Sequence, residues 1–177
     1  MVRGLIAGAL AVLLVAGCGS QPATGFNETD VMFLQMGLTQ IGEGDQVAAL
    51  AEQRAADPRL RTLATELRGQ WREESGAMKS RLTEWKQPLE ADPSAGAHEG
   101  HGDLHNLRPS DIAELREAED FDRTAVTLLL GHLGNCVETA RMESSGGEHP
   151  DVRALGSNVA SRRQAQIQSL LKLAAEP

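Results

Sequence analysis

The sequence predicts an all-α protein, a four-helix bundle (ferritin-like) made of two duplicated helical hairpins and preceded by a signal peptide. Three observations lead to this fold class. Four stretches carry apolar residues at steps of three and four, the spacing of an amphipathic helix. The chain resembles itself after a shift of 92 residues, which lays Pro58 on Pro150. The N-terminal apolar run is too short to span a membrane, which is typical of an export signal.

The N-terminus has the pattern of an exported lipoprotein. Arg3 precedes an apolar run from Leu5 to Val15, and small residues then lead to Cys18. The run "VAGC" resembles the bacterial lipobox, whose cysteine is diacylated and becomes the first mature residue. We therefore predict a signal peptide over residues 1–17, lipidation of Cys18, and a flexible tether over residues 18–26 that holds an extracytoplasmic domain to the membrane. A plain signal peptide with an accidental cysteine is the alternative.

The predicted mature chain is acidic and poor in aromatic residues. The full chain has 17 basic and 25 acidic residues, and the mature chain loses one of the basic residues, Arg3. The chain has no tyrosine. This composition argues against nucleic-acid binding, which needs basic patches and stacking platforms, and it gives no attraction to anionic lipid. With Cys18 lipidated, Cys136 has no partner for a disulfide, so the fold depends on packing.

The helical domain is predicted over residues 27–176, and its first hairpin over residues 27–86. The first helix begins with Asn27 or Asp30 as its cap and continues through "VMFLQMGLTQI" to about Ala51. Three glycines weaken this helix and predict a kink or a close contact with another helix, and they are Gly37, Gly42 and Gly44.

The second helix of this hairpin has the clearest pattern in the chain. Asp57 is its predicted N-cap and Pro58 its first residue, because proline has no amide hydrogen to leave unpaired there. The apolar residues that follow form one stripe, and they are Leu60, Leu63, Ala64, Leu67, Trp71, Met78, Leu82 and Trp85.

A linker is predicted over residues 87–109, where the helical period ends and proline, glycine, acidic residues and histidine become frequent. The second hairpin, residues 110–176, opens with a short helix capped by Ser110. A long helix then runs from Phe121 to about Met142. The last helix begins at the second of the two repeated prolines.

The two predicted hairpins correspond residue by residue after the shift of 92, so they look like products of a duplication. Two such hairpins pack most simply as an up-and-down bundle, whereas one long crossover between them gives a ferritin-like bundle. The corresponding pairs are Asp30 and Asp122, Leu34 and Val126, Leu38 and Leu130, Leu60 and Val152, Arg61 and Arg153, Leu63 and Leu155, Leu67 and Val159, and Met78 and Leu170.

Four runs of the sequence carry a resemblance to a known family. They are "FNETDVMFLQM", "DPRLRTLATELR", "FDRTAVTLLLGH" and "HPDVRALGSNVASRRQAQI". They resemble both halves of the domain-of-unknown-function family 305 (DUF305), from Phe26 to Leu173. The resemblance implies an exported, often lipid-anchored helical domain of ferritin-like architecture, some members of which bind copper. It also implies a Met-rich stretch and a His-His pair in the first helix of each hairpin, and inward Gln, Glu and Met in the second.

The sequence departs from the family at most of these ligand positions. The first histidine pair falls on Gln40 and Ile41, and only His132 remains of the second pair. The resemblance therefore implies a degenerate member that lacks most of the family's histidine and methionine ligands. The ligand positions that still match are Met36, Met78, His132 and Glu74.

The histidine that remains has a cysteine near it. His132 and Cys136 are four residues apart, which places both on one face of the predicted helix. Cu(I) accepts two or three soft ligands, so this pair with Met36 and Met78 could hold it, and Glu74 would add a hard ligand. Ordinary packing is the alternative, because a single buried histidine, methionine or cysteine is usually part of a core. The pattern fits the remains of a metal site.

A second set of candidate ligands lies in the linker. Imidazole and carboxylate groups suit zinc and Cu(II), and both occur there. A solvated polar loop is the alternative, since a glycine-rich segment loses much chain entropy when it binds. The candidate ligands are His98, His101 and His105, with Glu99 or Asp103.

Two arginines interrupt the apolar stripe of the last helix. Arg162 and Arg163 are adjacent and therefore about 100° apart around the helix, so at least one lies near the bundle interior or its edge. A buried arginine needs a charged partner, and Glu74 is the predicted one. An ion pair would then occupy the place where family members gather metal ligands.

No motif in the sequence supports catalysis. The Glu-x-x-His motifs of di-iron bundles, a nucleophile with its base, and a phosphate-binding glycine loop do not occur. We therefore predict a non-enzymatic binding or interaction module, anchored by lipid, whose protein partner the sequence does not identify. Copper or zinc handling outside the cytoplasm is the alternative. A ferritin-like redox enzyme would need inward carboxylates that the helix stripes lack.

Overall fold

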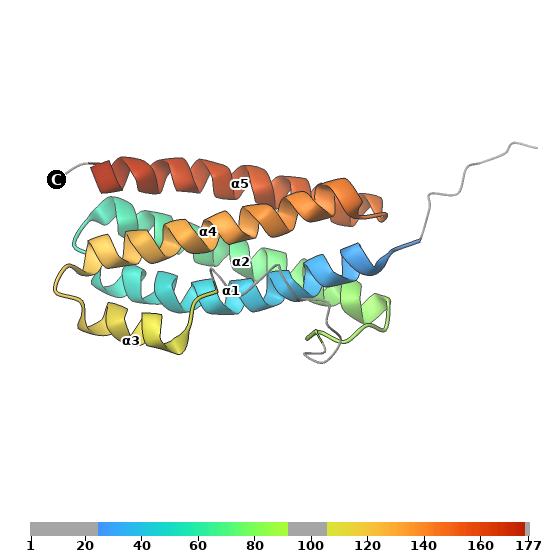
Figure 1. Ribbon diagram of the computed structural model, residues 1–177, viewed down its shortest axis with the longest axis horizontal. Coiled ribbons are helices and arrows are strands. Elements are labelled where there is room, and N and C mark those ends of the chain that lie inside the picture. Colours follow the sequence, from blue (N-terminus) through green and yellow to red (C-terminus); the bar gives the residue numbers. More distant parts are fainter. Residues whose placement is uncertain (1–24, 92–105, 176–177) are drawn as a thin grey trace, which may run out of the picture.

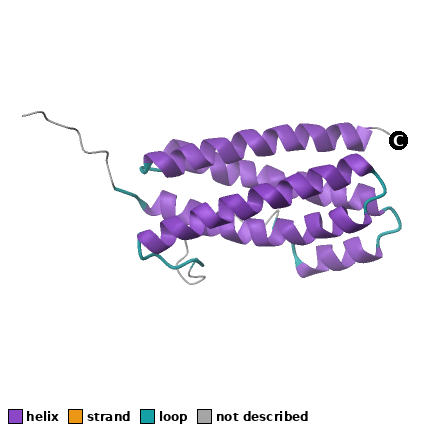
Figure 2. Cartoon of the chain, turned by 180° about the vertical axis from the view of Figure 1, so that it is seen from behind, coloured by secondary structure: helices purple, strands orange, loops and turns teal. Residues whose placement is uncertain are grey.

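The computed structural model describes residues 25–91 and 106–175. These residues form α helices and no strand, which confirms the predicted all-α class (Figure 1, Figure 2). None of the described helices combines the length and the apolar composition that crossing a membrane requires. The helices are α1 (Glu28–Arg54), α2 (Pro58–Glu84), α3 (Pro109–Glu117), α4 (Phe121–Gly146) and α5 (Pro150–Ala175).

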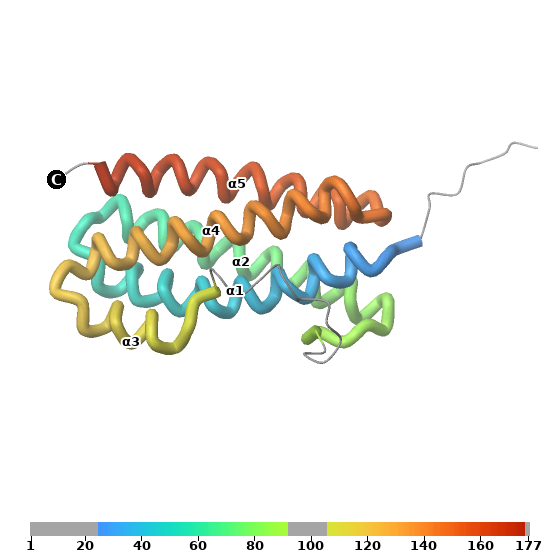
Figure 3. Tube along the Cα trace, viewed as in Figure 1, coloured from blue at the N-terminus to red at the C-terminus, as the bar shows by residue number. Residues whose placement is uncertain are grey.

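The four long helices form the bundle, and the short helix α3 lies against one end of it (Figure 1). α1 and α2 make one antiparallel hairpin, α4 and α5 make the other, and α1 packs along both α2 and α4. α4 starts at the end of the bundle where α2 starts, so these two helices run in the same direction (Figure 3). The structure therefore has the predicted ferritin-like arrangement with a long crossover, and not the up-and-down arrangement that the apolar stripes alone also allowed.

The long helices of the first hairpin begin at the predicted caps. The Asp30 amide donates to the Asn27 side chain at 3.0 Å, and the Asn27 amide donates back to Asp30 at 2.8 Å. The Arg59 amide donates to Asp57 at 2.7 Å, directly after the loop between α1 and α2. These caps satisfy amides that would otherwise lack a partner, because the first turn of a helix has no intrahelical acceptors for them.

The predicted start of α3 was wrong. Ser110 is not the cap, because the helix already begins at Pro109, whose fixed backbone angle suits the first helical position. The amide of Arg108 donates to the side chain of Asp111 at 2.9 Å and so closes this end of the helix.

α4 continues beyond Met142, the predicted end of this helix, to Gly146. The glutamate and serines after Met142 are compatible with a helix, and both serine hydroxyls donate to carbonyls one turn earlier. The helix ends where two glycines follow one another, because glycine loses the most backbone entropy in a helix. The amide of Gly147 makes the last bond, to the Glu143 carbonyl at 2.8 Å.

Each hairpin presents one aspartate to the other hairpin. Asp122, in the first turn of α4, accepts two hydrogen bonds from the backbone just before α2, and Asp30, in the first turn of α1, accepts two from the backbone just before α5. The two aspartates are repeat mates, which means that they correspond after the shift of 92 residues. The residues whose amides they bind are repeat mates as well. The bonds run from Ala56 and Asp57 to Asp122 at 2.9 and 2.7 Å, and from Glu148 and His149 to Asp30 at 3.0 Å each.

Apolar side chains fill the bundle in two clusters that lie toward its two ends. One includes Leu67 and Leu133, and the other includes Phe33 and Met78. Between them, at the middle of the helices, lies a set of buried polar residues that we call the polar band. Its members are Gln40, Glu74, His132, Thr139, Arg163 and Gln166.

Two of the three glycines in α1 mark close contacts with other helices. A Cβ on Gly37 would lie 2.7 Å from Cε of Met78, and a Cβ on Gly44 would lie 2.4 Å from Nε2 of His132. Gly42 is exposed and has nothing within 4 Å of such a Cβ. The predicted close contact is therefore confirmed at two of the three positions.

Loss of either aspartate that joins the hairpins is expected to destabilise the bundle. Asp30→Ala should lower the free energy of unfolding by about 3 kcal/mol, because it leaves buried amides unpaired, and the less buried Asp122→Ala by about 1 kcal/mol. Denaturant unfolding measures both values. Glu119→Ala, at an exposed position, is the control and should change stability by less than about 0.5 kcal/mol. Equally small losses for both aspartates would contradict the assigned role.

Candidate functional site

Among the predicted ligands that the structure describes, two lie together. His132 and Cys136 lie on adjacent turns of α4, and both are buried. Met78 packs on Gly37 of α1, whereas His132 packs on Gly44. Two helical turns, roughly 10 Å, therefore separate Met78 from His132 along α1.

The other predicted ligands lie apart from this pair or outside the described residues. Met36 is partly buried beside Gly37, and Glu74 is bound by arginine side chains. Within residues 25–91 and 106–175, no group of three or more His, Cys, Asp or Glu side chains is arranged to hold a metal ion. Cys18, His98, His101 and His105 lie outside the described residues.

His132 and Cys136 are both neutral at neutral pH. Burial, and then the charge of Arg163, lowers the pKa of His132 to about 4, and the carbonyl of Gln40 offsets this in part. Burial also raises the pKa of the Cys136 thiol to about 12. Sγ of Cys136 lies 3.7 Å from Nε2 of His132. The pair is therefore an imidazole beside a thiol, without an ionised member.

This pair matches the ligand preference of Cu(I) better than that of other metals, because Cu(I) accepts as few as two soft ligands. A neutral imidazole is already in the form that binds metals, but a thiol must first lose its proton. The raised pKa of Cys136, caused by burial, opposes that step, and the positive charge of Arg163 offsets only part of the rise. The same charge would repel a metal ion held by the pair, so metal binding here would work against both burial and Arg163.

A buried ion pair occupies the middle of the polar band. Arg163, 1% exposed, donates to one carboxylate oxygen of Glu74, which is 4% exposed. Arg162, about half exposed, lies 3.7 Å from the other oxygen. This confirms the predicted pair and identifies Arg163 as its buried arginine. Burial raises the pKa of Glu74 and lowers that of Arg163, and each charge opposes the shift of the other.

Two glutamines add acceptors for Arg163, and sequence reasoning missed their role. Nη1 of Arg163 donates to Gln70 at 2.9 Å and to Gln166 at 3.0 Å, and Gln166 also donates to Gln70 at 3.0 Å. A signal was present, since Gln70 lies one turn before Glu74 and Gln166 is the repeat mate of Glu74. The guanidinium is thus held from both α2 and α5.

Trp71 stands between the ion pair and the histidine. The guanidinium of Arg163 lies over its ring, 5.6 Å from the centroid, and the ring of His132 meets it edge-on at 6.0 Å. Trp71 and Arg163 are repeat mates, so the same position on the facing helices α2 and α5 holds an indole in one hairpin and a cation in the other. The pair gains from the attraction of a cation to an aromatic face.

A second buried acid, Glu143, faces Asp30 near the start of α1. Glu143 is 0% exposed, and neither of its carboxyl oxygens has a donor among the described residues. Burial raises its pKa to about 8, and the neighbouring Asp30 carboxylate adds to the shift. Burial alone would raise the pKa of Asp30, but backbone donors outweigh it and lower that pKa. Glu143 is therefore protonated at neutral pH and can share its proton with Asp30.

Sequence reasoning missed Glu143 for an identifiable reason. The predicted helix ended near Met142, which left Glu143 outside it, and the repeat mate of Glu143 is Ala51, which gives no hint of a buried acid. A buried carboxyl of this kind depends on the tertiary contact with Asp30, which no local pattern records.

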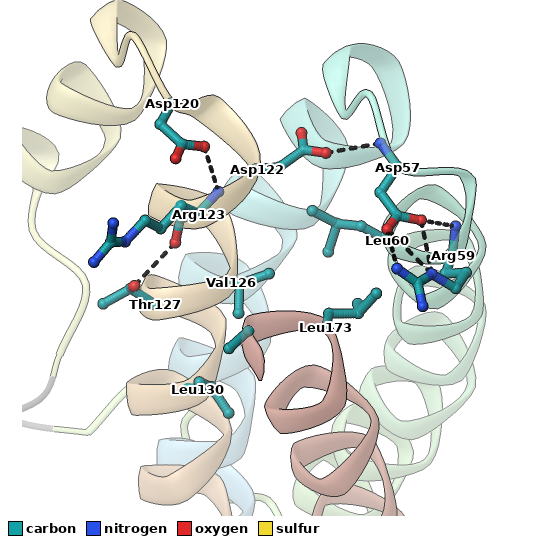
Figure 4. Close-up of a pocket in the computed structure, with 11 residues that line it drawn as sticks. Asp57, Arg59, Leu60, Asp120, Asp122, Arg123, Val126, Thr127, Leu130 and Leu173 are labelled. Carbon is teal, nitrogen blue, oxygen red and sulfur yellow. Dashed lines mark hydrogen bonds and ion pairs between the residues drawn. The ribbon is translucent and has the colours of Figure 1, made fainter. Parts of the chain in front are cut away.

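A cavity of about 700 Å³ opens at the opposite end of the bundle, where α2 and α4 begin and α5 ends (Figure 4). Its lining is mixed, because aspartates and arginines at its rim stand beside apolar side chains. The rim aspartates already accept backbone amides as helix caps or as the contact between hairpins. The apolar residues are Leu60, Val126, Leu130 and Leu173, and the rim aspartates are Asp57, Asp120 and Asp122.

Comparison with known proteins identifies relatives of the whole domain. The family model described as "Domain of unknown function (DUF305)" matches residues 30–174. No curated protein matches the chain in sequence.

Several solved structures share the fold. CopM in its Cu(II)-bound form is 24% identical with a TM-score of 0.71, over 82% of this chain and 95% of CopM. A DUF305 fragment from Deinococcus radiodurans is 21% identical with a TM-score of 0.72, over 88% and 99% of the two chains. A DUF305 protein from Streptomyces coelicolor is 15% identical with a TM-score of 0.76, over 83% and 92%. At these identities the likeness shows the fold.

The buried ion pair gives a direct test by double substitution. Glu74→Gln alone should cost about 3–5 kcal/mol of the free energy of unfolding, because it leaves Arg163 buried without a negative partner. Glu74→Gln with Arg163→Leu should cost far less, since no buried charge remains. Arg162→Leu, at the half-exposed neighbour, is the control and should cost less than about 1 kcal/mol. Strictly additive losses in denaturant unfolding would refute the pair.

Glu143 predicts a pH dependence with a definite sign. Its folded-state pKa of about 8 lies above its ordinary value of 4.5, so the native state holds more protons between these values. The stability that neutral Glu143 contributes is therefore complete below the ordinary value and is lost as the pH rises through the folded-state value. Glu143→Gln keeps a donor for Asp30 without titrating, so the variant should gain stability relative to wild type across this window. Unfolding at several pH values measures the difference, and a constant difference would contradict the assignment.

Proposed function

The chain belongs to the DUF305 family, and from this premise we propose that it is an extracytoplasmic, lipid-anchored and non-enzymatic binding module whose interior is closed to metal. The observation that carries the proposal is the buried pair of Arg163 and Glu74 in the polar band. A fixed guanidinium stands where the family resemblance places metal ligands. The surface of the bundle is then the part that binds, and its ligand is a protein partner.

The charge of Arg163 is the physical reason for the closed interior. Two cations repel strongly in a protein interior, because the effective dielectric constant there is far below that of water. A metal ion held by His132 and Cys136 would meet the charge that already lowers the pKa of His132. The carboxylate of Glu74, which could neutralise a metal ion, is committed to Arg163 and Arg162. The ion pair therefore removes the one acidic ligand and adds a competing cation.

Two features support the proposed location. The run "VAGC" resembles a lipobox, and the apolar segment before Cys18 has the length of a signal sequence. Acyl chains on Cys18 would anchor the domain stably only as more than one chain, which the lipobox modification provides. The sequence also lacks a nucleophile with its base and a phosphate-binding loop, which supports a role without catalysis.

Copper handling is the second candidate function, and one contact favours it. Sγ of Cys136 and Nε2 of His132 are 3.7 Å apart, within reach of a single Cu(I) ion. CopM, which shares the fold, has been crystallised with Cu(II), Cu(I) and silver bound. Zinc or Cu(II) capture by the linker is the other form of this function, with His98, His101 and His105 as ligands.

A competition titration separates these functions. The domain from Ser20 onward is titrated with Cu(I) and with Zn(II) against a chelator, and the wild type is expected to leave the metal with the chelator. The variant Glu74→Gln with Arg163→Met removes both charges of the ion pair, and it is expected to gain Cu(I) binding at His132 and Cys136. Binding that appears only in this variant would identify the ion pair as the element that closes the interior.

Two further variants serve as controls. Tight one-to-one binding by the wild type that disappears with His132→Ala would contradict the proposal and establish copper handling in the bundle. Binding that survives His132→Ala but disappears when the three linker histidines are changed to alanine would place the metal on the linker. The histidines in that triple variant are His98, His101 and His105.

A further inference from the structure

Three segments meet at the end of the bundle where α1 begins: the residues before α1, the C-terminal end of α2, and the turn between α4 and α5 (Figure 1). Phe26 stacks on Trp85 with ring centroids 4.1 Å apart and planes inclined by 10°. His149 lies 5.2 Å from the Trp85 ring, and the guanidinium of Arg81 lies 5.7 Å above it. Trp85 thus fixes the place where the chain that leads back to Cys18 leaves the domain.

The stacked rings are only partly buried. Phe33 and Trp71 are each 1% exposed, whereas Phe26 and Trp85 both keep contact with solvent. We call Phe26 and Trp85 the aromatic end. Such a surface favours a boundary between water and an apolar phase, where the indole can keep its N–H in a polar layer.

The tether keeps this end close to any lipid on Cys18. Phe26 lies eight positions after Cys18, and a chain of eight residues spans at most about 29 Å. α1 alone, with 27 residues, is about 40 Å long. The opposite end of an upright bundle therefore lies beyond the reach of the tether, whereas the aromatic end is held within it.

Resting on the lipid anchor proposed above, we infer that the aromatic end contacts the surface of the bilayer that carries Cys18. Phe26 and Trp85 lie at the level of the lipid headgroups, and the anchor supplies the high local concentration that makes a small apolar contact sufficient. Exposed acids stand at the same end, so the contact suits zwitterionic rather than anionic headgroups. These acids are Glu28, Glu84 and Glu148.

This contact orients the whole bundle. The helix axes stand on the membrane at the aromatic end, and the cavity at the starts of α2 and α4 faces away from it (Figure 4). A partner that approaches from outside therefore meets that far end and the sides of the bundle first.

The two tryptophans of the chain provide the test, because Trp85 belongs to the aromatic end and Trp71 is buried. The full-length lipidated protein is placed in phosphatidylcholine vesicles with and without bromine on the acyl chains. The variant Trp71→Phe reports on Trp85, and its emission is expected to shift to the blue and to be quenched by bromine. The matched control, Trp85→Phe, reports on Trp71, whose emission should not change.

If Trp71→Phe does not fold, a second measurement gives the signal of Trp85. The emission of Trp85→Phe is subtracted from that of the wild type, and the difference is the emission of Trp85. Mass spectrometry of Cys18 separates the two proposals. Acylated Cys18 with unquenched Trp85 would overturn the membrane contact and leave the anchor. Equal quenching of both tryptophans would overturn the upright orientation. Cys18 without acyl chains would overturn the anchor and the contact together.

Discussion

The exchange of aspartate side chains between the hairpins is the interaction on which the rest of the fold depends. Asp30 and Asp122 each complete the N-terminal end of a helix in the other hairpin, so neither second helix is fully hydrogen-bonded in an isolated hairpin. Helix direction follows from this exchange. Because the start of α4 contacts the start of α2, these two helices run in parallel. The chain leaves α2 at the other end of the bundle, so it must return along the length of the bundle before α4 begins. The crossover and α3 are consequences of that requirement.

The distances between the helices at the middle of the bundle depend on the polar band and on the glycines near it. α1 approaches α2 and α4 closely because Gly37 and Gly44 leave room for Met78 and His132. α2 and α5 instead meet through long side chains, since Arg163 reaches Glu74 and Gln70 across the gap. A buried guanidinium is tolerated only where acceptors surround it, and here α2 and α5 both supply them. The same charge that orders this part of the core makes it a poor place for a metal ion.

Features with local causes could be predicted from the sequence, whereas most features that depend on tertiary contacts could not. The caps at Asn27 and Asp57 and the duplicated hairpins follow from neighbouring residues and from the repeat, and the structure confirms them. The partner of Arg163 was also predictable, because a buried charge restricts the choice of partner. The crossover was predicted only through the family resemblance, since either topology buries the same apolar stripes. Glu143 was not predictable, because its burial depends on Asp30, more than 100 residues away. The predicted site at His132 and Cys136 exists as a contact, without the further ligands that the sequence suggested.

The meeting of Trp71 with its repeat mate Arg163 bears on the history of the duplication. A chain built from two copies of the first hairpin would bury two Glu74 carboxylates with no cation between them. A chain built from two copies of the second would bury two guanidiniums with no carboxylate. The halves are therefore no longer interchangeable. Replacement of Arg163 or Glu74 alone leaves an unpaired buried charge, so a change that makes the two halves alike again is tolerated best when both residues change together.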